Sequence, residues 1–258
     1  MASKNDNAAR ARSLAQSQVH RKERKSTIII VAVSVVGLAL FAGLVFFIVN
    51  GSKVPALDDP GAALPAGSDT TGGIPVGKTG IVGVDVPGDD VPQVAIYEDF
   101  MCPICNQFEQ VNSADIDALR EAGEIAVSYH PISILDRVSL GTQYSTRAAN
   151  AAATVADQAP EYFHPFAEAL YVNQPEENTE GLDDATIASI AVSVGVPQDV
   201  ADSLDNGTFR KWVLAATDSA SQAGANGTPT IIVNGEILDQ NVVPYFNPGA
   251  LRTYLESL

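Results

Sequence analysis

The segment VAIYEDFMCPIC, Val94–Cys105, contains both cysteines of this 258-residue chain. Val94–Tyr97 is a short apolar run that is typical of a buried strand. Cys102 follows it at an expected helix N-cap, because Pro103 favours the first helical position and Cys105 falls one turn inside. Unpaired N–H groups and the positive end of the helix dipole would then face the sulfur of Cys102. The segment predicts a strand, a turn and a helix that begins at a stabilised thiolate.

A thiolate at Cys102 would be a nucleophile near neutral pH, and Cys105 could resolve a mixed disulfide by attacking it. Two other interpretations remain open. A structural disulfide would close a loop of two intervening residues and so remove little chain entropy. A zinc site needs about four ligands, but there is no second CxxC, and neither His130 nor His164 lies near a spare thiol in sequence. We therefore predict redox chemistry and no metal site.

Around this segment the apolar pattern predicts a strand, helix and strand. Ile81–Val86 and Val94–Tyr97 are expected strands, and Ile125–Tyr129 alternates with a period of two. Pro103–Ala122 carries apolar residues at helical spacing, and Gly123 supplies a stop signal.

The second half of the chain predicts a helical insertion and a return to the sheet. The region about 139–222 has helical periodicity, and we expect its Phe209 and Trp212 to pack in the core rather than to line a groove. TPTIIVNGEIL, Thr228–Leu238, then has strand character with a hairpin signal at Asn234-Gly235. Apolar residues at helical spacing follow to Leu258. The pattern indicates an α/β domain interrupted by helices.

The N-terminal third predicts a membrane anchor. Residues 27–49 carry no charge and are long enough to cross a bilayer as one transmembrane helix; a buried core helix and a cleaved signal peptide are the alternatives. The basic tail 1–26 is expected in the cytoplasm, because positive residues favour that side. Residues 50–78, rich in Gly, Pro and Ala, are expected to form a flexible extracytoplasmic linker to a domain at 79–258. This places a single-pass protein in the cell membrane.

The net charge of the chain limits the kinds of molecule that it is expected to bind. The formal net charge is −16, which disfavours nucleic acid as a partner.

Two segments resemble a known family. EDFMCPIC, Glu98–Cys105, is similar to the active-site segment of the DsbA-like thiol:disulfide oxidoreductases. GTPTIIVNG, Gly227–Gly235, resembles the loop and strand that carry the cis-proline of the thioredoxin fold. The resemblance covers most of 79–258 and implies a thioredoxin-like fold with an inserted helical domain.

The resemblance also implies roles for residues. Cys102 would react with substrate, Cys105 would resolve, and Pro229 would be cis, with Thr228 presenting its backbone to a bound peptide. Apart from the resemblance, a carboxylate at Asp99 or Glu98 could relay the proton of Cys105. The alternative is that both are solvated acids at a strand end.

These features together suggest a function. Since the chain has no third cysteine, its dithiol must exchange with another molecule. We expect an anchored oxidase that donates the Cys102–Cys105 disulfide to exported cysteine-containing proteins. A membrane partner using quinone would reoxidise it, and the redox-active disulfide would be its only redox group, without a cofactor. The alternatives are a reductase or isomerase kept reduced by a membrane electron donor, and a non-catalytic binding domain.

Overall fold

The computed structural model describes residues 33–46, 56–57, 59 and 61–258. The chain divides into two units, Met1–Lys53 and Val54–Leu258. In the first unit, residues 33–46 are helical with exposed side chains. The predicted tail 1–26 and both ends of the predicted transmembrane helix 27–49 lie outside the described residues. Within the described part of the chain, no helix combines the length and apolar character needed to cross a membrane.

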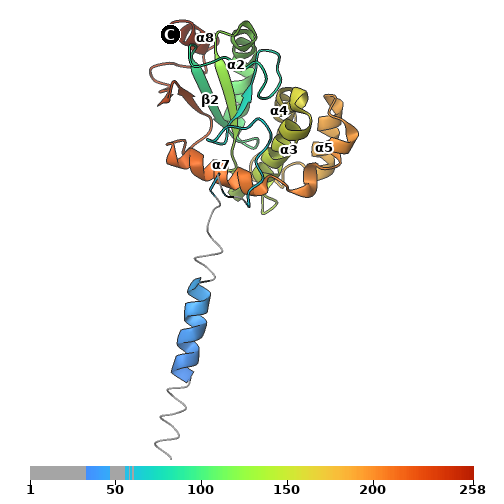
Figure 1. Cartoon of the computed structure of the whole chain (residues 1–258), viewed down its shortest axis with the longest axis vertical. Coiled ribbons are helices and arrows are strands. Elements are labelled where there is room, and N and C mark those ends of the chain that lie inside the picture. Colours follow the sequence, from blue (N-terminus) through green and yellow to red (C-terminus); the bar gives the residue numbers. More distant parts are fainter. Residues whose placement is uncertain (1–32, 47–55, 58, 60) are drawn as a thin grey trace, which may run out of the picture. The chain divides into compact units, whose positions relative to one another are not determined.

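The second unit is built on a five-stranded mixed sheet with the strand order β1-β3-β2-β4-β5 (Figure 1). β2 and β3 are parallel, whereas β1 pairs with β3, β4 with β2, and β5 with β4 in antiparallel fashion. The strands are β1 (Ile74–Val76), β2 (Gln93–Glu98), β3 (Ala126–Pro131), β4 (Thr230–Val233) and β5 (Glu236–Ile237).

Helix α2 (Pro103–Ala122) connects the two parallel strands and ends at Gly123. Gly123 has φ 76°, a conformation that glycine adopts without steric cost. The N–H of Gly123 donates to the Arg120 carbonyl and the N–H of Glu124 to the Leu119 carbonyl, which closes the helix. α8 (Ala250–Leu255) packs on α2. The predicted helix and its stop are confirmed.

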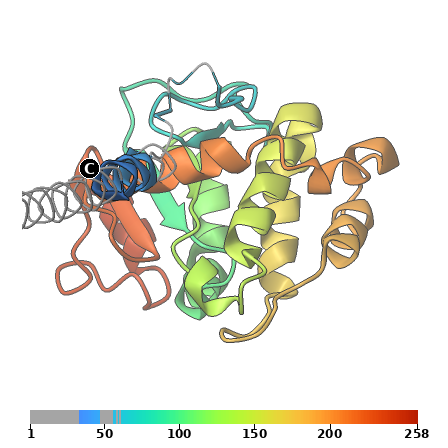
Figure 2. The ribbon, with the colours of Figure 1, turned by 90° about the horizontal axis from the view of Figure 1, so that it is seen from below.

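The chain between β3 and β4 is mainly helical, and Figures 1 and 2 show α3, α4 and α5 gathered beside the sheet. Phe209 and Trp212 are buried, as predicted for core residues. The helices are α3 (Tyr144–Gln158), α4 (Phe163–Val172), α5 (Asp184–Ser193), α6 (Gln198–Ala201) and α7 (Arg210–Gln222). Short 3₁₀ turns lie at η1 (Asp136–Val138), η2 (Pro160–Tyr162) and η3 (Leu204–Asn206).

Two expectations at the start of the domain are wrong. The predicted strand Ile81–Val86 contains one bridge residue, Val82, because Gly83 and Asp85 have positive φ angles that break an extended run. The first strand is Ile74–Val76 instead, inside the predicted linker 50–78. Its two branched side chains are buried against the sheet, so the domain begins before residue 79.

Candidate functional site

Both cysteines lie at the start of α2. Cys102 is the N-cap residue, with φ −80° and ψ 114°, no side-chain cap, and Pro103 in the first helical turn. Its carbonyl accepts from the N–H groups of Cys105 at 3.1 Å and Asn106 at 3.2 Å. The cysteine sulfur therefore lies beside N–H groups of the first turn, where negative charge is favoured.

The two thiols are free and have opposite acidities. A hydrogen bond from Cys105, aided by the Thr228 side chain and the N–H groups of Cys105 and Ile104, outweighs burial and lowers the pKa of Cys102 to about 6. Burial raises the pKa of Cys105 well above its ordinary value, and its hydrogen bond to Cys102 adds to that shift. Cys102 is thus the thiolate of the pair, and Cys105 is its protonated donor.

The Thr228–Pro229 loop lies against the nucleophile. The Thr228–Pro229 peptide bond is cis, as the resemblance implied. In the thiol form, the Cys102 sulfur donates to the Thr228 carbonyl at 3.4 Å, across 126 residues of sequence. Both loop residues are half-buried, so backbone beside the reactive sulfur remains open to a partner.

Asp99 shapes the loop before the cysteines. Its side chain is fully buried, and its two oxygens accept from the N–H groups of Met101 and Leu135, each at 2.9 Å. Burial raises the pKa of Asp99 to about 7 despite these bonds. The alternative of a solvated acid is wrong for Asp99, because the side chain is buried and joins the loop before the cysteines to the chain after β3.

Glu98, the last residue of β2, is the second acid that precedes the cysteines. It is 2% exposed, and its Oε2 has no hydrogen-bond partner among the described residues. Burial, followed by the charge of Glu109, raises the pKa of Glu98 well above its ordinary value. A charge on Glu98 in turn raises the pKa of Cys105. A buried acid can exchange a proton with a nearby thiol, and of the two carboxyl groups Glu98 is the one whose charge affects the pKa of Cys105.

Two amide side chains that the sequence did not single out complete the site. Gln174, just after α4, donates from Nε2 to the carbonyls of Phe100 at 3.0 Å and Cys102 at 2.9 Å. Asn106 donates to the Tyr171 carbonyl at 3.0 Å and to Gln174 at 3.3 Å. The helical insertion therefore forms one wall of the site. Gln174 belongs to no motif, so only its contacts reveal it.

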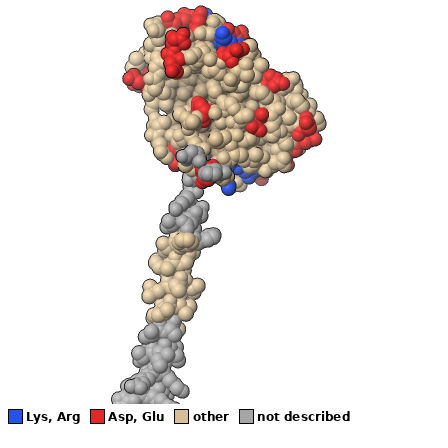
Figure 3. Space-filling view, in the orientation of Figure 1, with Lys and Arg blue, Asp and Glu red and all other residues tan. Residues whose placement is uncertain are grey.

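Apolar side chains are exposed close to the dithiol. Ile104, between the cysteines, is 46% exposed, and Val172, at the end of α4, is 83% exposed. Val172 lines a cavity together with Asn106. Elsewhere, acidic side chains are spread over the face seen in Figure 3. Ile104 and Val172 are thus two apolar side chains that α2 and α4 leave exposed.

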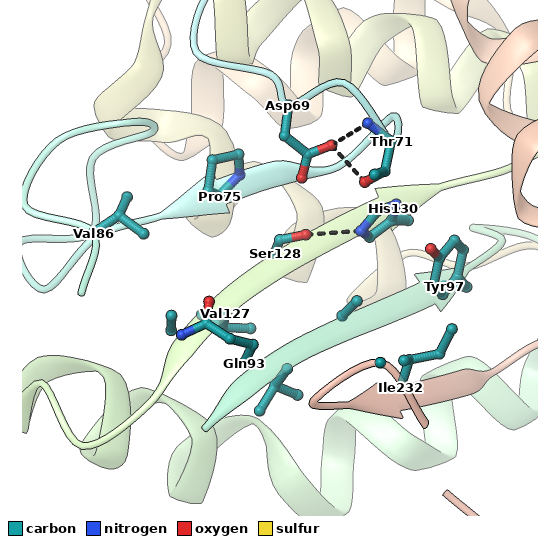
Figure 4. A pocket seen from close by; sticks show the side chains of 14 residues that line it. Asp69, Thr71, Pro75, Val86, Gln93, Tyr97, Val127, Ser128, His130 and Ile232 are labelled. Atoms are coloured by element: carbon teal, nitrogen blue, oxygen red, sulfur yellow. Dashed lines mark hydrogen bonds between the residues drawn. The ribbon is translucent and has the colours of Figure 1, made fainter. Parts of the chain in front are cut away.

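His130 belongs to a different part of the molecule. It stacks on Tyr97 with ring centroids 4.1 Å apart, and its Nε2 lies 2.7 Å from the Ser128 hydroxyl (Figure 4). Burial lowers the pKa of His130 to about 4. The cysteines are not among the residues that line its pocket of about 340 Å³ on the sheet.

Comparison with known proteins agrees with this geometry. A family model described as Thioredoxin matches residues 90–245. The chain belongs to the thioredoxin family. Among solved structures, DsbA of Mycobacterium tuberculosis in its reduced form is 27% identical with a TM-score of 0.56, over 72% of this chain and 98% of that one.

Two curated relatives are covered to different extents by this chain. The serine/threonine-protein kinase PknE of Mycobacterium tuberculosis is 32% identical over 54% of this chain, which spans only 26% of the kinase. Disulfide bond formation protein D of Bacillus subtilis is 27% identical over 63% of this chain and 72% of its own length.

Proposed function

We propose that this protein is a membrane-anchored thiol:disulfide oxidoreductase that donates the Cys102–Cys105 disulfide to exported cysteine-containing proteins. The observation that carries the proposal is the opposite shift of the two thiol pKa values beside the half-buried Thr228–Pro229 loop. The similarity to a DsbA and to a disulfide bond formation protein supports the same class of reaction.

The geometry supports a two-step exchange. In the first step, a substrate thiolate attacks the Cys102 sulfur, the Cys102–Cys105 bond breaks, and Cys105 leaves as a thiolate that takes a proton from Glu98. In the second step, another substrate thiolate attacks the substrate sulfur of the mixed disulfide, and Cys102 leaves. The substrate loses two electrons and gains a disulfide, while the protein holds a dithiol.

The acidity of Cys102 favours this direction. A thiol of lower pKa is the better leaving group in disulfide exchange, so the pKa of about 6 for Cys102 speeds release of an oxidised substrate. The cis-proline loop and the exposed Ile104 and Val172 would hold an extended, apolar segment beside the sulfur.

A folding assay tests the oxidase directly. The oxidised protein should restore activity to a reduced, unfolded enzyme that needs disulfides, and Cys102→Ser should abolish this. Cys105→Ala should instead accumulate mixed disulfides through Cys102. Thiol trapping in cells should find the dithiol mostly oxidised, whereas a mostly reduced dithiol would favour the reductase or isomerase. A wild-type protein without activity in thiol–disulfide exchange would favour a non-catalytic binding domain.

The anchor and the reoxidising partner belong to the same proposal. The uncharged residues 27–49 and the basic tail 1–26 support a cytoplasmic N-terminus and an extracytoplasmic domain. Protease added to protoplasts should remove the domain and spare the tail; the reverse pattern would overturn this topology. Quinone depletion should shift the trapped dithiol toward the reduced form if a quinone-linked membrane partner reoxidises it.

A further inference from the structure

A second cluster of chemically active side chains lies between α2 and α4, which pack against each other. Asp117 comes from α2, and His164 and Glu168 stand one turn apart on α4. One candidate ligand atom from each residue lies within 4.8 Å of the others. His164 Nε2 and Asp117 Oδ1 are 2.9 Å apart. One imidazole and two carboxylates therefore converge from two helices.

Buried polar atoms beside this cluster lack partners. Glu109, on α2, is 8% exposed, and its Oε1 has no hydrogen-bond partner among the described residues. Nδ1 of the buried His164 is likewise without one in that part of the chain. Glu109 and Glu168 line one cavity of about 320 Å³. Because buried polar atoms are almost always bonded, these groups indicate that a ligand belongs here.

Ion pairs within the protein occupy only some of the carboxylate oxygens of the cluster. Arg120 donates to Asp117 Oδ1 from Nε at 3.2 Å and from Nη2 at 3.0 Å. These bonds and the His164 bond all end at Oδ1, so Oδ2 remains for another ligand. Arg120 has no such bond to Glu109 or Glu168 among the described contacts. Arg120 therefore pairs with Asp117 but leaves the carboxylates of Glu109 and Glu168 without a bond to it.

We propose that Asp117, His164 and Glu168 bind a divalent transition-metal ion, with Zn²⁺ as the best fit, and that Glu109 borders the same site. Zn²⁺ binds imidazole nitrogen and carboxylate oxygen with bonds of about 2.0–2.2 Å, and a site with three protein ligands keeps its fourth position for water. The imidazole favours zinc over calcium, which prefers oxygen ligands alone. The cavity shared by Glu109 and Glu168 provides an entry path from solvent.

The site would join two parts of the fold. Asp117 lies on the helix that carries the cysteines, whereas His164 and Glu168 lie in the insertion. A bound ion would hold α2 against α4 and stabilise the folded chain by RT ln(1 + [Zn²⁺]/Kd). The sequence predicts no metal site, because no second CxxC accompanies the thiols and these three residues are 47 apart in sequence at the closest contact.

Zinc uptake tests the proposal. The full-length chain should be purified in mild detergent and fully oxidised, so that the dithiol cannot bind zinc. We expect about one tightly bound Zn²⁺ by calorimetry and by metal analysis after desalting. At a free Zn²⁺ concentration about 100-fold above Kd, the thermal midpoint should rise by about 5–10 °C. Chelator should reverse that rise.

Matched variants separate the site from adventitious binding. Glu168→Gln keeps the shape of the side chain and should weaken zinc binding at least about 10-fold, while its thermal midpoint without metal reports whether it folds. Glu161→Gln removes an exposed carboxylate, and His130→Gln removes the other histidine that is buried in the described part of the chain. Both variants should bind zinc as the wild type does. The proposal would be overturned if the wild type took up no zinc or if Glu168→Gln bound zinc with unchanged affinity. It would also be overturned if His130→Gln lost zinc uptake or if the wild type bound Ca²⁺ more tightly than Zn²⁺. None of these results depends on oxidoreductase activity.

Discussion

Ionisation of Cys102 should set the redox strength of the protein at neutral pH. The pKa of Cys102 is about 6, compared with about 8.5 for a free thiol. At pH 7 this ionisation lowers the free energy of the reduced form by RT ln(1 + 10), about 1.4 kcal/mol, whereas a thiol of pKa 8.5 would contribute almost nothing. For a two-electron couple, about 1.4 kcal/mol corresponds to about 30 mV. The helix start and its hydrogen bonds should therefore make the disulfide about 30 mV more oxidising.

The sign of the effect fixes its pH dependence. Because the pKa of Cys102 is lowered, the stabilisation of the reduced form is present above pH 6 and is lost as the pH falls through about 6. Below that pH, two protons accompany the two electrons, and the potential should change by about 59 mV per pH unit. Above it, only Cys105 takes a proton, and the slope should fall to about 30 mV per unit.

Two measurements test this reasoning. Equilibration with glutathione buffers between about pH 5 and 8 gives the potential, which should lie between about −270 mV and −120 mV at neutral pH, the values of thioredoxin and DsbA. Ultraviolet thiolate absorbance gives the pKa of Cys102. Cys105→Ser keeps a hydrogen-bond donor and should preserve that pKa, whereas Cys105→Ala should raise it. A slope that stays constant between about pH 5 and 8, or a potential at or above about −120 mV, would refute the argument.

Three further substitutions test other parts of the site and fold. Ile104→His adds a donor and a charge beside the sulfur, so the pKa of Cys102 should fall and the potential should rise; an unchanged thiolate titration would contradict this. Glu98→Gln cannot supply a proton to Cys105, so the first exchange step should slow about 10-fold or more while the pKa of Cys102 stays near 6, and stopped-flow quenching would detect the change. Trp212→Ala leaves a cavity where a fully buried side chain stood, so the free energy of unfolding should fall by about 3–5 kcal/mol in a urea titration. A loss below about 1 kcal/mol would mean that the core is not organised around this side chain.

The helix that carries the cysteines could be predicted because its signals are local. Cys102, Pro103 and Gly123 occupy adjacent or terminal positions whose conformations follow from steric and hydrogen-bonding rules. The hairpin at Asn234-Gly235 was predictable for the same reason, since both residues have the positive φ angles that its turn requires.

The environment of the two acids could not be predicted. Glu98 and Asp99 end a strand, where solvent exposure is common, but both are buried in this fold. Their burial depends on neighbours distant in sequence. Leu135 donates to Asp99, and burial, followed by the charge of Glu98, raises the pKa of Tyr171. β1 was missed because Ile74–Val76 is too short to show a period.

The two hydrogen bonds from Gln174 have a consequence for protein engineering. Replacing the helices between β3 and the Thr228–Pro229 loop with a short connection would produce a smaller protein that keeps CPIC and the cis-proline. The carbonyls of Phe100 and Cys102 would, however, lose this donor. Transplanting the four-residue motif into another scaffold would likewise move the nucleophile without the amide that holds its backbone. Conversely, a library confined to Gln174 could vary the reactivity of Cys102 from 72 residues away and leave every residue of the motif untouched.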